Sequence, residues 1–409
     1  MRIVHTFIKY PPAIGGHERY VQDLVEGLRG RGYDARVVTS TLRKHIASRK
    51  RPRLLRRLDA LRGTGGANAE LFLDGPYAEV NGVPVTRLDP RLPLSRKIEL
   101  KGLRETLIAM KPDVIHAHDI WRDSFEVSID VARELGVPLL LNTVYHDLSG
   151  SKRAERWGRH FRGMVERLPA GTPVFFNTPW EGEQLAKLGV RFPQTDLLPP
   201  SLDAEALDAL PEVEVPGLPE GRVIVSCVGR MHAGKRMDLL IRAFAAALGK
   251  LRERDEATAQ RAHLVLAGFR ETDEDYLALA EACGIGDRFS LLLDRPREQI
   301  VQVLRRSSVF ALPSACETFG IVVLEAWATG NLVLVSDKWA LPYVVRDGVD
   351  GRICSDEAWP EMLAQALLDS RRPEGRALVE AGMQTVRRDH TREARLDRLA
   401  AHLERLAAS

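Results

Sequence analysis

The sequence is poor in features that mark several classes of protein. It has four cysteines (Cys227, Cys283, Cys316 and Cys354), widely spaced and without a C-x-x-C pair. This spacing does not indicate a disulfide framework or a structural zinc site, and it favours reduced thiols in the cytosol. No run approaches the roughly 18 to 20 apolar residues of a membrane-spanning helix, and the first residues predict a strand instead of a signal peptide. We therefore expect a cytoplasmic protein.

The charge is small overall but unevenly distributed. The net charge is +3, yet residues 1–200 contain 32 Lys and Arg against 23 Asp and Glu, whereas residues 201–409 contain 27 against 33. An anionic partner is therefore expected to meet the N-terminal half. The segment Arg43–Arg62 alone holds nine Lys and Arg and one acid, with leucines at helical spacing in its second half. It predicts either an amphipathic helix on an anionic membrane surface or a solvated loop, and no base-reading motif accompanies it, so no nucleic acid is expected.

Apolar segments alternate with amphipathic ones along the whole chain. Strands are predicted at residues 2–8, 35–39, 83–88, 114–116, 137–142, 174–176, 196–198, 223–228, 263–267, 290–293, 309–312 and 332–335. Buried strands separated by helices are typical of doubly wound parallel sheets. Residues 211–221 are rich in Pro and Gly and indicate a linker. We predict an α/β protein with an N-terminal domain (1–210), a C-terminal domain (211–390) and a final amphipathic helix (391–409).

One segment combines a strand, a glycine-containing loop and a buried helix. Residues 310–330 read FALPSACETFGIVVLEAWATG, with Glu317 on the loop and Glu325 about two helical turns further on, near the same face. The free N–H groups and dipole at such a helix start attract phosphate, and the flanking carboxylates suggest that hydroxyl groups are recognised beside it. Taken alone, the segment is equally consistent with Glu317 as a helix cap and Glu325 as a surface charge.

A second segment has the same strand–loop–helix pattern. Arg230 and Lys235 lie on a loop between an apolar strand and the helix that begins at Met237, where a diphosphate would also be held. Together, GRMHAGKRMDLLIRAF and LPSACETFGIVVLEAWATG resemble the family 4 retaining glycosyltransferases, which have the GT-B fold. The family pattern is G-R-x4-K-G-x-D-x-L-I-x-A-F, followed after about seventy residues by P-S-x2-E-x-F-G-x3-L-E-A.

The resemblance implies two doubly wound Rossmann-like domains facing each other across a cleft. The N-terminal domain would bind the acceptor and the C-terminal domain the nucleotide-sugar donor, and the last helix (391–409) would cross back onto the N-terminal domain. It implies retaining, metal-independent transfer from a nucleotide-diphosphate sugar, without a cofactor. The implied donor-binding residues are Gly15, Gly16, Arg230, Lys235, Glu317, Thr318, Phe319, Gly320 and Glu325. Arg230 and Lys235 would stabilise the leaving diphosphate, while Glu317 and Glu325 would hold hydroxyls of the sugar and of the ribose. Residues 289–295 depart from the family segment that frames the base, so UDP- and GDP-sugars both stay open.

Two histidines are candidate acceptor-binding residues. The run His116-Ala117-His118-Asp119 is predicted to leave its strand at the carboxyl end, where open parallel sheets bind ligands. The H-x-H pair lacks a clear third ligand, so no metal is predicted. The resemblance implies that His118 faces the reacting sugar and is catalytic together with Arg230, Lys235 and Glu317. His146 follows the next strand toward the same cleft, and a purely structural histidine remains an equal alternative for both.

Two other functions stay open. A non-catalytic sugar-nucleotide-binding regulatory or partner subunit would bind the donor without turnover, and a sugar phosphorylase of similar fold would use free phosphate. Intact Arg230, Lys235, Glu317 and Glu325 argue against the first alternative. The expected acceptor is a glycan or a lipid-linked glycan, with peripheral attachment to the inner face of the membrane through Arg43–Arg62 as a further expectation.

Overall fold

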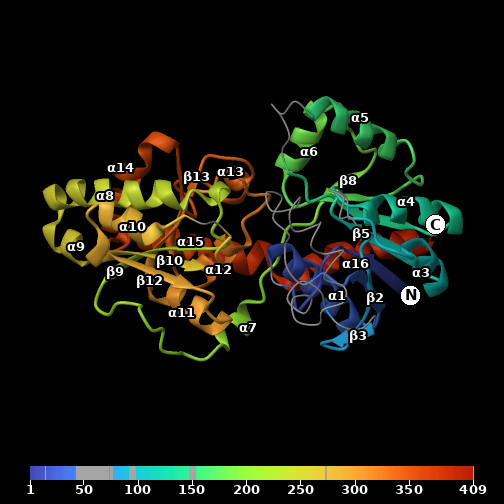
Figure 1. The fold of residues 1–409 in the computed structure, drawn as a ribbon, viewed down its shortest axis with the longest axis horizontal. Helices are drawn as coiled ribbons and strands as arrows, with labels where there is room; N and C mark the ends of the chain where they lie inside the picture. The colour runs from blue at the N-terminus through green and yellow to red at the C-terminus, as the bar shows by residue number, and fades with distance from the viewer. Residues whose placement is uncertain are drawn as a thin grey trace, which may run out of the picture. The chain divides into compact units, whose positions relative to one another are not determined.

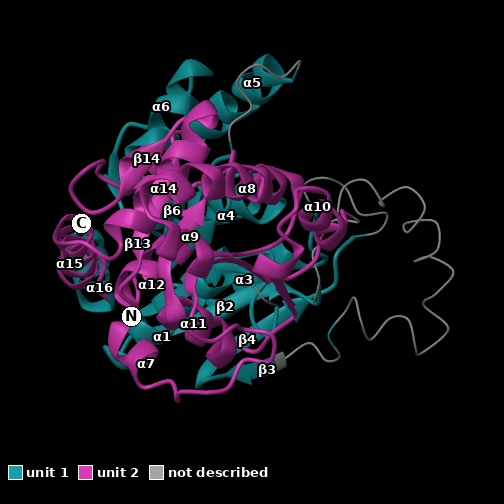
Figure 2. Ribbon diagram, turned by 90° about the vertical axis from the view of Figure 1, so that its left-hand side faces the viewer, with its two compact units in different colours: residues 1–199, 392–409 teal, residues 200–391 magenta. Residues whose placement is uncertain are grey.

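The computed structural model describes residues 1–13, 15–42, 73, 77–91, 98–146, 153–271 and 274–408. The chain forms two compact units, which Figure 2 shows in different colours. Unit 1 contains Met1–Pro199 and Arg392–Ser409, and unit 2 contains Pro200–Thr391. Both units are α/β, as the alternation of segments predicted. The basic segment Arg43–Arg62 lies outside the described residues, so its predicted helix is not addressed by the structure.

Unit 1 is built on an eight-stranded sheet. Its strands are β1 (Arg2–Thr6), β2 (Asp34–Ser40), β3 (Tyr77–Val80), β4 (Val83–Leu88), β5 (Val114–His118), β6 (Leu139–Asn142), β7 (Val174–Phe176) and β8 (Thr195–Leu197). Their order is β3-β4-β2-β1-β5-β6-β7-β8, and only the β3–β4 pair is antiparallel among the described strand pairs of this sheet. The strand order reverses direction at β1, so a topological switch point lies between β1 and β5. Open α/β sheets bind ligands at this point, beyond the carboxyl ends of the strands.

Helices surround this sheet. They are α1 (Gly16–Gly30), α3 (Leu103–Met110), α4 (Asp123–Leu135), α5 (Ala154–Val165), α6 (Pro179–Lys187) and α16 (Arg392–Ala408). Helix α1 buries Tyr20, Leu24 and Leu28 on one stripe. The last helix of the chain, α16, belongs to this unit and packs against α1. Its Arg395 guanidinium lies 3.6 Å from the centre of the Tyr20 ring.

Unit 2 is built on a fully parallel six-stranded sheet. Its strands are β9 (Val223–Val228), β10 (Ala262–Gly268), β11 (Phe289–Leu293), β12 (Ser307–Leu312), β13 (Leu332–Ser336) and β14 (Arg352–Cys354). The spatial order β11-β10-β9-β12-β13-β14 is the 3-2-1-4-5-6 order of a Rossmann sheet, with the switch point between β9 and β12. All six residues of β9 are buried, because helices cover both faces of the sheet. The structure thus confirms the predicted strands of this half, with ends that differ by one or two residues.

The helices of unit 2 form a layer on each face of the sheet. They are α7 (Ala204–Asp208), α8 (Met237–Arg254), α9 (Glu256–Arg261), α10 (Tyr276–Ala282), α11 (Arg297–Arg306), α12 (Ile321–Ala328), α13 (Leu341–Val344), α14 (Trp359–Asp369) and α15 (Pro373–Asp389). Figure 1 shows α8, α10 and α14 over one face, and α11 and α12 over the other.

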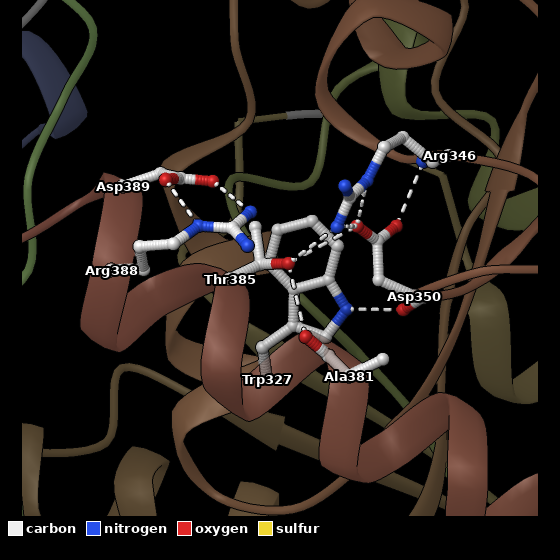
Figure 3. Close-up of polar contacts among 7 residues, drawn as sticks. All are labelled: Trp327, Arg346, Asp350, Ala381, Thr385, Arg388 and Asp389. Atoms are coloured by element: carbon white, nitrogen blue, oxygen red, sulfur yellow. Dashed lines mark hydrogen bonds and ion pairs between the residues drawn. The ribbon is translucent and has the colours of Figure 1, made fainter.

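A buried polar network anchors α12. The Asp350 carboxylate, which is 1% exposed, accepts hydrogen bonds from Arg346 at 2.6 Å and from Thr385 on α15 at 3.2 Å (Figure 3). The indole Nε1 of Trp327 on α12 donates to the Asp350 carbonyl oxygen at 2.7 Å. Since every member of such a network restrains its neighbours, it holds α12 in place against α15 and β13. This helix carries one of the predicted site residues, Glu325.

Candidate functional site

The two predicted donor motifs flank the switch point of unit 2. Residues 229–236 follow β9, and residues 313–320 follow β12. The Ala315 amide donates to the Gly234 carbonyl oxygen at 2.8 Å, and the Ser314 hydroxyl donates to the same oxygen at 3.2 Å. Two motifs that are distant in the sequence therefore form one continuous surface at the carboxyl edge of the sheet.

Lys235 and Glu317 are brought into direct contact. The Lys235 ammonium group donates to the Glu317 carboxylate, although the two residues are 82 positions apart. Their side chains are only 13% and 11% exposed, so water screens this pair weakly. A buried charge of each sign would be costly to keep without its partner. The pair therefore fixes the position of both side chains beside the start of α12.

Arg230 lies on the same loop. Its guanidinium is 3.2 Å from the Glu271 carboxylate and is 44% exposed. Burial lowers the pKa of His232, and the positive charges of Arg230 and Lys235 lower it further. Burial and the Glu317 charge raise the pKa of Cys316, whereas Lys235 and Arg230 act in the opposite direction. Both cations thus act on the same local surroundings, where a diphosphate would meet two positive charges.

A close backbone contact fixes the base of this loop. Gly268, with φ of +144°, ends β10 directly beside Gly229, and a Cβ on Gly268 would lie 1.8 Å from the Gly229 carbonyl oxygen. The Met231 amide donates to the Phe269 carbonyl oxygen at 2.7 Å, which extends the pairing past the strands. Only glycine fits at position 268. The sequence pattern did not identify this requirement, because it depends on which strands are neighbours.

Arg236 occupies a position where the family pattern has glycine. Its φ is +54°, a left-handed conformation that side chains other than glycine adopt at a cost. Its guanidinium pairs with Asp356 at 2.6 Å. We interpret this ion pair as part of what holds the left-handed turn between Lys235 and α8.

Three predicted donor residues form the entry to α12. Gly320 precedes the helix with φ of +86°, which lets the loop turn directly into the first helical residue. Phe319 is 4% exposed, and its ring lies 5.4 Å from that of His390. Thr318 is also buried. Phe319 is therefore a packing residue that orients the loop, while the backbone N–H groups at the helix start provide the anion-binding potential.

Glu325 has a partner that the sequence pattern did not indicate. Its carboxylate is 2.7 Å from the guanidinium of Arg297, the first residue of α11, and Glu325 is 7% exposed. The simpler expectation that Glu325 is a surface charge is wrong. The separation of Arg297 and Glu325 in the sequence matches no known motif. The two residues meet only because α11 packs beside α12.

In unit 1, the histidines lie differently from the prediction. Strand β5 continues through His118, so the H-x-H pair does not leave the strand as predicted. His116 and His118 are fully buried, and so is His5 of β1, the register partner of His116. The His5 Nδ1 and His118 Nε2 atoms are 3.2 Å apart. Burial lowers the pKa of all three rings, that of His116 to about 3, and the charge of Arg395 adds to the effect. These shifts favour the neutral form of all three imidazoles. No local sequence pattern indicated that His5 would join them.

His146 lies in a different setting. It is exposed, and its ring centre is 6.3 Å from that of His17 on α1. The turn before it contains Val144 with φ of +46°, an uncommon conformation for a β-branched residue. The buried Glu181 carboxylate accepts hydrogen bonds from the Tyr145 amide at 2.7 Å and from the Thr143 hydroxyl at 2.6 Å, and burial raises its pKa to about 7. This carboxylate holds the strained turn that presents His146.

The glycine loop of unit 1 leads into α1. Gly15 precedes the helix and Gly16 is its first residue. Glu18 in the first turn pairs with Lys9, which follows β1, at 2.6 Å, and both side chains are largely buried. Each unit thus has a Lys–Glu pair whose lysine follows its first strand, and neither pair was predicted from the sequence.

Family models match nearly the whole chain. A glycosyl transferase 4-like domain matches residues 15–201, and a glycosyl transferases group 1 domain matches residues 211–380. The chain belongs to the family 4-type glycosyltransferases. It therefore has the GT-B fold that its two motifs indicated. None of the described helices combines the length and apolar content needed to span a bilayer.

Curated relatives include D-inositol 3-phosphate glycosyltransferases of several bacteria. The protein of Nocardiopsis dassonvillei is 30% identical over 296 residues, which cover 62% of this chain and 65% of the relative. That of Mycolicibacterium gilvum is 32% identical over 287 residues, covering 66% of this chain and 61% of the relative. That of Nocardia farcinica is 35% identical over 208 residues, covering 48% and 45%. The aligned part thus spans about half to two thirds of the length of these relatives.

Solved structures of low sequence identity share the fold over the full length. Sucrose-phosphate synthase of Thermosynechococcus elongatus superposes with a TM-score of 0.71 at 20% identity, covering all of both chains. HepE of Anabaena in complex with UDP superposes with a TM-score of 0.71 at 17% identity, covering 99% of this chain and all of the other.

Proposed function

We propose that this chain transfers a sugar from a nucleotide-diphosphate sugar to an acceptor hydroxyl with retention of configuration. The Lys235–Glu317 contact is the observation that carries the proposal. It joins the loops after β9 and β12 at the switch point of unit 2, where such sheets bind nucleotides. A cation for the diphosphate and a carboxylate for sugar hydroxyls are then adjacent, as transfer from a sugar nucleotide requires.

In this proposal the leaving diphosphate is stabilised without a divalent ion. Lys235, Arg230 and the N–H groups at the start of α12 would share the negative charge that develops on the departing oxygen. On donor binding, the Lys235 ammonium group would contact phosphate, and Glu317 would accept hydrogen bonds from the sugar. Glu325 would accept from the ribose hydroxyls, with Arg297 fixing its carboxylate. Retention would follow from attack on the face that the diphosphate leaves, with a phosphate oxygen taking the acceptor proton.

UDP is the nucleotide to test first. Structures of HepE contain UDP, UDP-glucose, or UDP with glucose, and one of a pneumococcal O-GlcNAc transferase contains UDP and GlcNAc. Thermal unfolding of the chain with UDP, GDP and ADP would identify the base, because a ligand at a hundredfold excess over its dissociation constant stabilises the folded state by about 2.7 kcal/mol. The preferred nucleotide should then define the sugar nucleotides worth assaying.

The proposed acceptor is anionic. The cations of unit 1 and of the segment Arg43–Arg62 favour a negatively charged lipid or lipid-linked glycan. WaaG, of similar fold, is involved in lipopolysaccharide biosynthesis. The curated relatives are named for D-inositol 3-phosphate, an anion that would suit the same positive charge. Sedimentation with anionic vesicles distinguishes a lipid acceptor from a soluble one. A lipid surface is supported if the chain binds vesicles at low salt and loses this binding at high salt. Binding should also be lost when Arg49, Lys50, Arg51 and Arg53 become Ser. A wild-type chain that stays in the supernatant at low salt rules out the membrane.

The reaction itself is tested by the release of nucleoside diphosphate. The chain is incubated with the sugar nucleotide of the preferred base and with either inositol phosphate or lipid extract. Acceptor-dependent release is the expected result. Binding without release under all conditions would favour the non-catalytic sensor, and formation of a sugar phosphate from free phosphate would favour the phosphorylase.

A further inference from the structure

His5, His116 and His118 form a three-histidine cluster in the interior of unit 1. His5 comes from β1, and the other two come from the neighbouring parallel strand β5, on the same face of the sheet. One ring nitrogen of each residue lies within 4.8 Å of those of the other two. All three side chains are fully buried. The cluster spans the switch point of unit 1, where side chains of two strands converge.

Three ring nitrogens in this cluster lack a partner. Among the described residues, none offers a hydrogen bond to His5 Nε2, His116 Nδ1 or His118 Nδ1. Leaving a buried polar atom without a partner is costly, and native interiors rarely do so without a reason such as an ion or water. Because the His5–His118 contact shares one proton, one of His5 Nε2 and His118 Nδ1 is an N–H group and the other is a bare lone pair.

The hydrogen bonds around Asn142 decide the tautomer of His116. The Tyr20 hydroxyl donates to the Leu198 carbonyl oxygen at 3.2 Å, so it accepts from Asn142 Nδ2 at 2.9 Å. The Asn142 Oδ1 atom, 2.8 Å from His116 Nε2, is then an acceptor, and Nε2 must carry the proton. His116 Nδ1 is consequently a bare lone pair in the interior. A histidine whose other nitrogen donates to a fixed oxygen is the usual arrangement of a metal ligand.

The distance between His5 and His118 suits the same chemistry. Their Nδ1 and Nε2 atoms are 3.2 Å apart. Two imidazole ligands of a tetrahedral zinc ion, each about 2.0 to 2.1 Å from the metal, have nitrogens about 3.4 Å apart. A cation placed between these atoms would replace the shared proton, which would move to the other nitrogen of its own ring. The present separation of these two nitrogens is thus close to the one that a shared ion requires.

We propose that His5, His116 and His118 bind one divalent ion of the zinc class. Imidazole donors without carboxylates select late first-row ions over Mg²⁺ or Ca²⁺, and three protein ligands leave a fourth position for water or hydroxide. This site is distinct from the diphosphate loops of unit 2 and does not depend on sugar transfer. An ion on His118 would also hold that side chain in place and compete with its contact to a sugar.

One nearby group opposes the ion. Arg395 stacks on Tyr20, and its positive charge acts on all three rings. Removing this positive charge should therefore strengthen binding: Arg395→Met should bind the ion several-fold more tightly. Removing a ligand should weaken it: His5→Gln should bind the ion at least 100-fold more weakly. Loosening of the fold would weaken binding in both variants. Asn142→Leu, which removes the group that orients His116, should cost roughly 10- to 100-fold in affinity.

The test uses the full chain without a histidine tag, stripped with a chelator and titrated with Co²⁺ and then Zn²⁺. The wild type should bind one Co²⁺ per chain with the visible absorption of a tetrahedral site, and Zn²⁺ should displace it. His263→Gln is the matched control, because His263 is a buried strand histidine of unit 2 with an unpartnered Nδ1 among the described residues. The His263→Gln chain should bind Co²⁺ with the stoichiometry and affinity of wild type.

Failure of the wild type to bind one ion would overturn the proposal without any variant. Equal affinity of His5→Gln and wild type, or equal losses in His5→Gln and His263→Gln, would place the ion elsewhere and overturn it as well. If His5→Gln does not fold, the comparison of Arg395→Met with wild type still decides, since unchanged or weaker binding by an Arg395→Met chain that unfolds at the same urea concentration as wild type contradicts the proposed position of the ion.

Discussion

The two units have sheets of the same plan but carry opposite chemistry at their switch points. In unit 2, the loops after β9 and β12 bear the charged groups Arg230, Lys235 and Glu317, which are partly accessible. In unit 1, the facing strands β1 and β5 carry His118 and its two neighbouring histidines, which are buried and neutral. One fold thus supports a charged site and an uncharged one.

The difference follows from where the side chains lie along the strands. Lys235 and Glu317 lie on loops beyond the strand ends, where each ionised group has the other as a partner of opposite charge. His116 and His118 lie within β5, where ionisation would be too costly. A diphosphate needs the first environment. The buried, uncharged environment of the histidines suits an acceptor hydroxyl or a metal ion.

Loss of Lys235 should have the largest effect. In Lys235→Ala, turnover should fall on the order of 100-fold or more, because an electrostatic donor to the leaving group contributes roughly 3 to 4 kcal/mol at the transition state. The assay is the initial rate of nucleoside diphosphate release. Lys250→Ala, which removes a surface ion pair with Glu361 on α14, is the control, and its rate should equal that of wild type. Turnover of Lys235→Ala within threefold of wild type would contradict the role of Lys235 in stabilising the leaving diphosphate at the charged site of unit 2.

Glu181 tests the uncharged half through pH. Its folded-state pKa is raised from 4.5 to about 7, so between these values the folded chain binds more protons than the unfolded chain. Its contribution to stability is therefore complete below pH 4.5 and is lost as pH rises through 7, by about 3 kcal/mol. Urea unfolding of wild type and Glu181→Gln at pH 5 and pH 8 should show the wild type losing stability relative to the variant by this amount. A difference that does not change with pH would show that burial does not govern this carboxyl group.

The two glutamates of unit 2 should separate binding from turnover. Glu325→Ala should weaken the binding of plain UDP or GDP about tenfold or more, since a hydrogen bond to a charged group is worth roughly 1.5 to 3 kcal/mol. Glu317→Ala should chiefly reduce turnover of the bound sugar nucleotide. Calorimetric titration and steady-state rates measure the two effects, with Glu361→Ala as a surface control. Equal losses of nucleotide affinity in both variants would refute this division.

Arg236 should give the smallest effect. Arg236→Gly relieves a left-handed residue, which costs roughly 1 to 2 kcal/mol, and loses a partly exposed ion pair worth about 0 to 1 kcal/mol. The free energy of unfolding should thus rise by about 0 to 2 kcal/mol. Arg242→Gly, in the exposed interior of α8, should instead lower it by about 1 kcal/mol. A loss of stability in Arg236→Gly comparable to that in Arg242→Gly would mean that the Asp356 pair outweighs the backbone strain.

The charged half of the comparison was largely predictable from sequence, and the buried half was not. Strand–loop–helix patterns are local, so Arg230, Lys235, Glu317 and the helix start at Gly320 could be placed in advance. The buried cluster depends on β1 lying beside β5, which brings His5 to His116 across 111 residues of chain. No local pattern encodes that pairing. For the same reason the sequence left the H-x-H pair without a third ligand.

The partners of predicted residues were also hidden. Arg297 pairs with Glu325 because α11 packs beside α12, and Gly268 is required because β10 ends against Gly229. Each is a property of neighbouring strands or helices. The sequence predicted that β5 ends at His116, because a polar side chain after an apolar run normally marks the end of a strand. In the structure β5 continues through His118, which is fully buried.

Amide hydrogen exchange of the full chain, with and without saturating UDP or GDP, tests the central claim most directly. The claim is that the charged edge of unit 2 holds the nucleotide diphosphate. The account predicts slower exchange in peptides covering residues 229–236 and 315–323, and loss of this protection in Lys235→Ala. Protection confined to unit 1, or nucleotide binding that leaves both unit 2 loops unchanged, would contradict it.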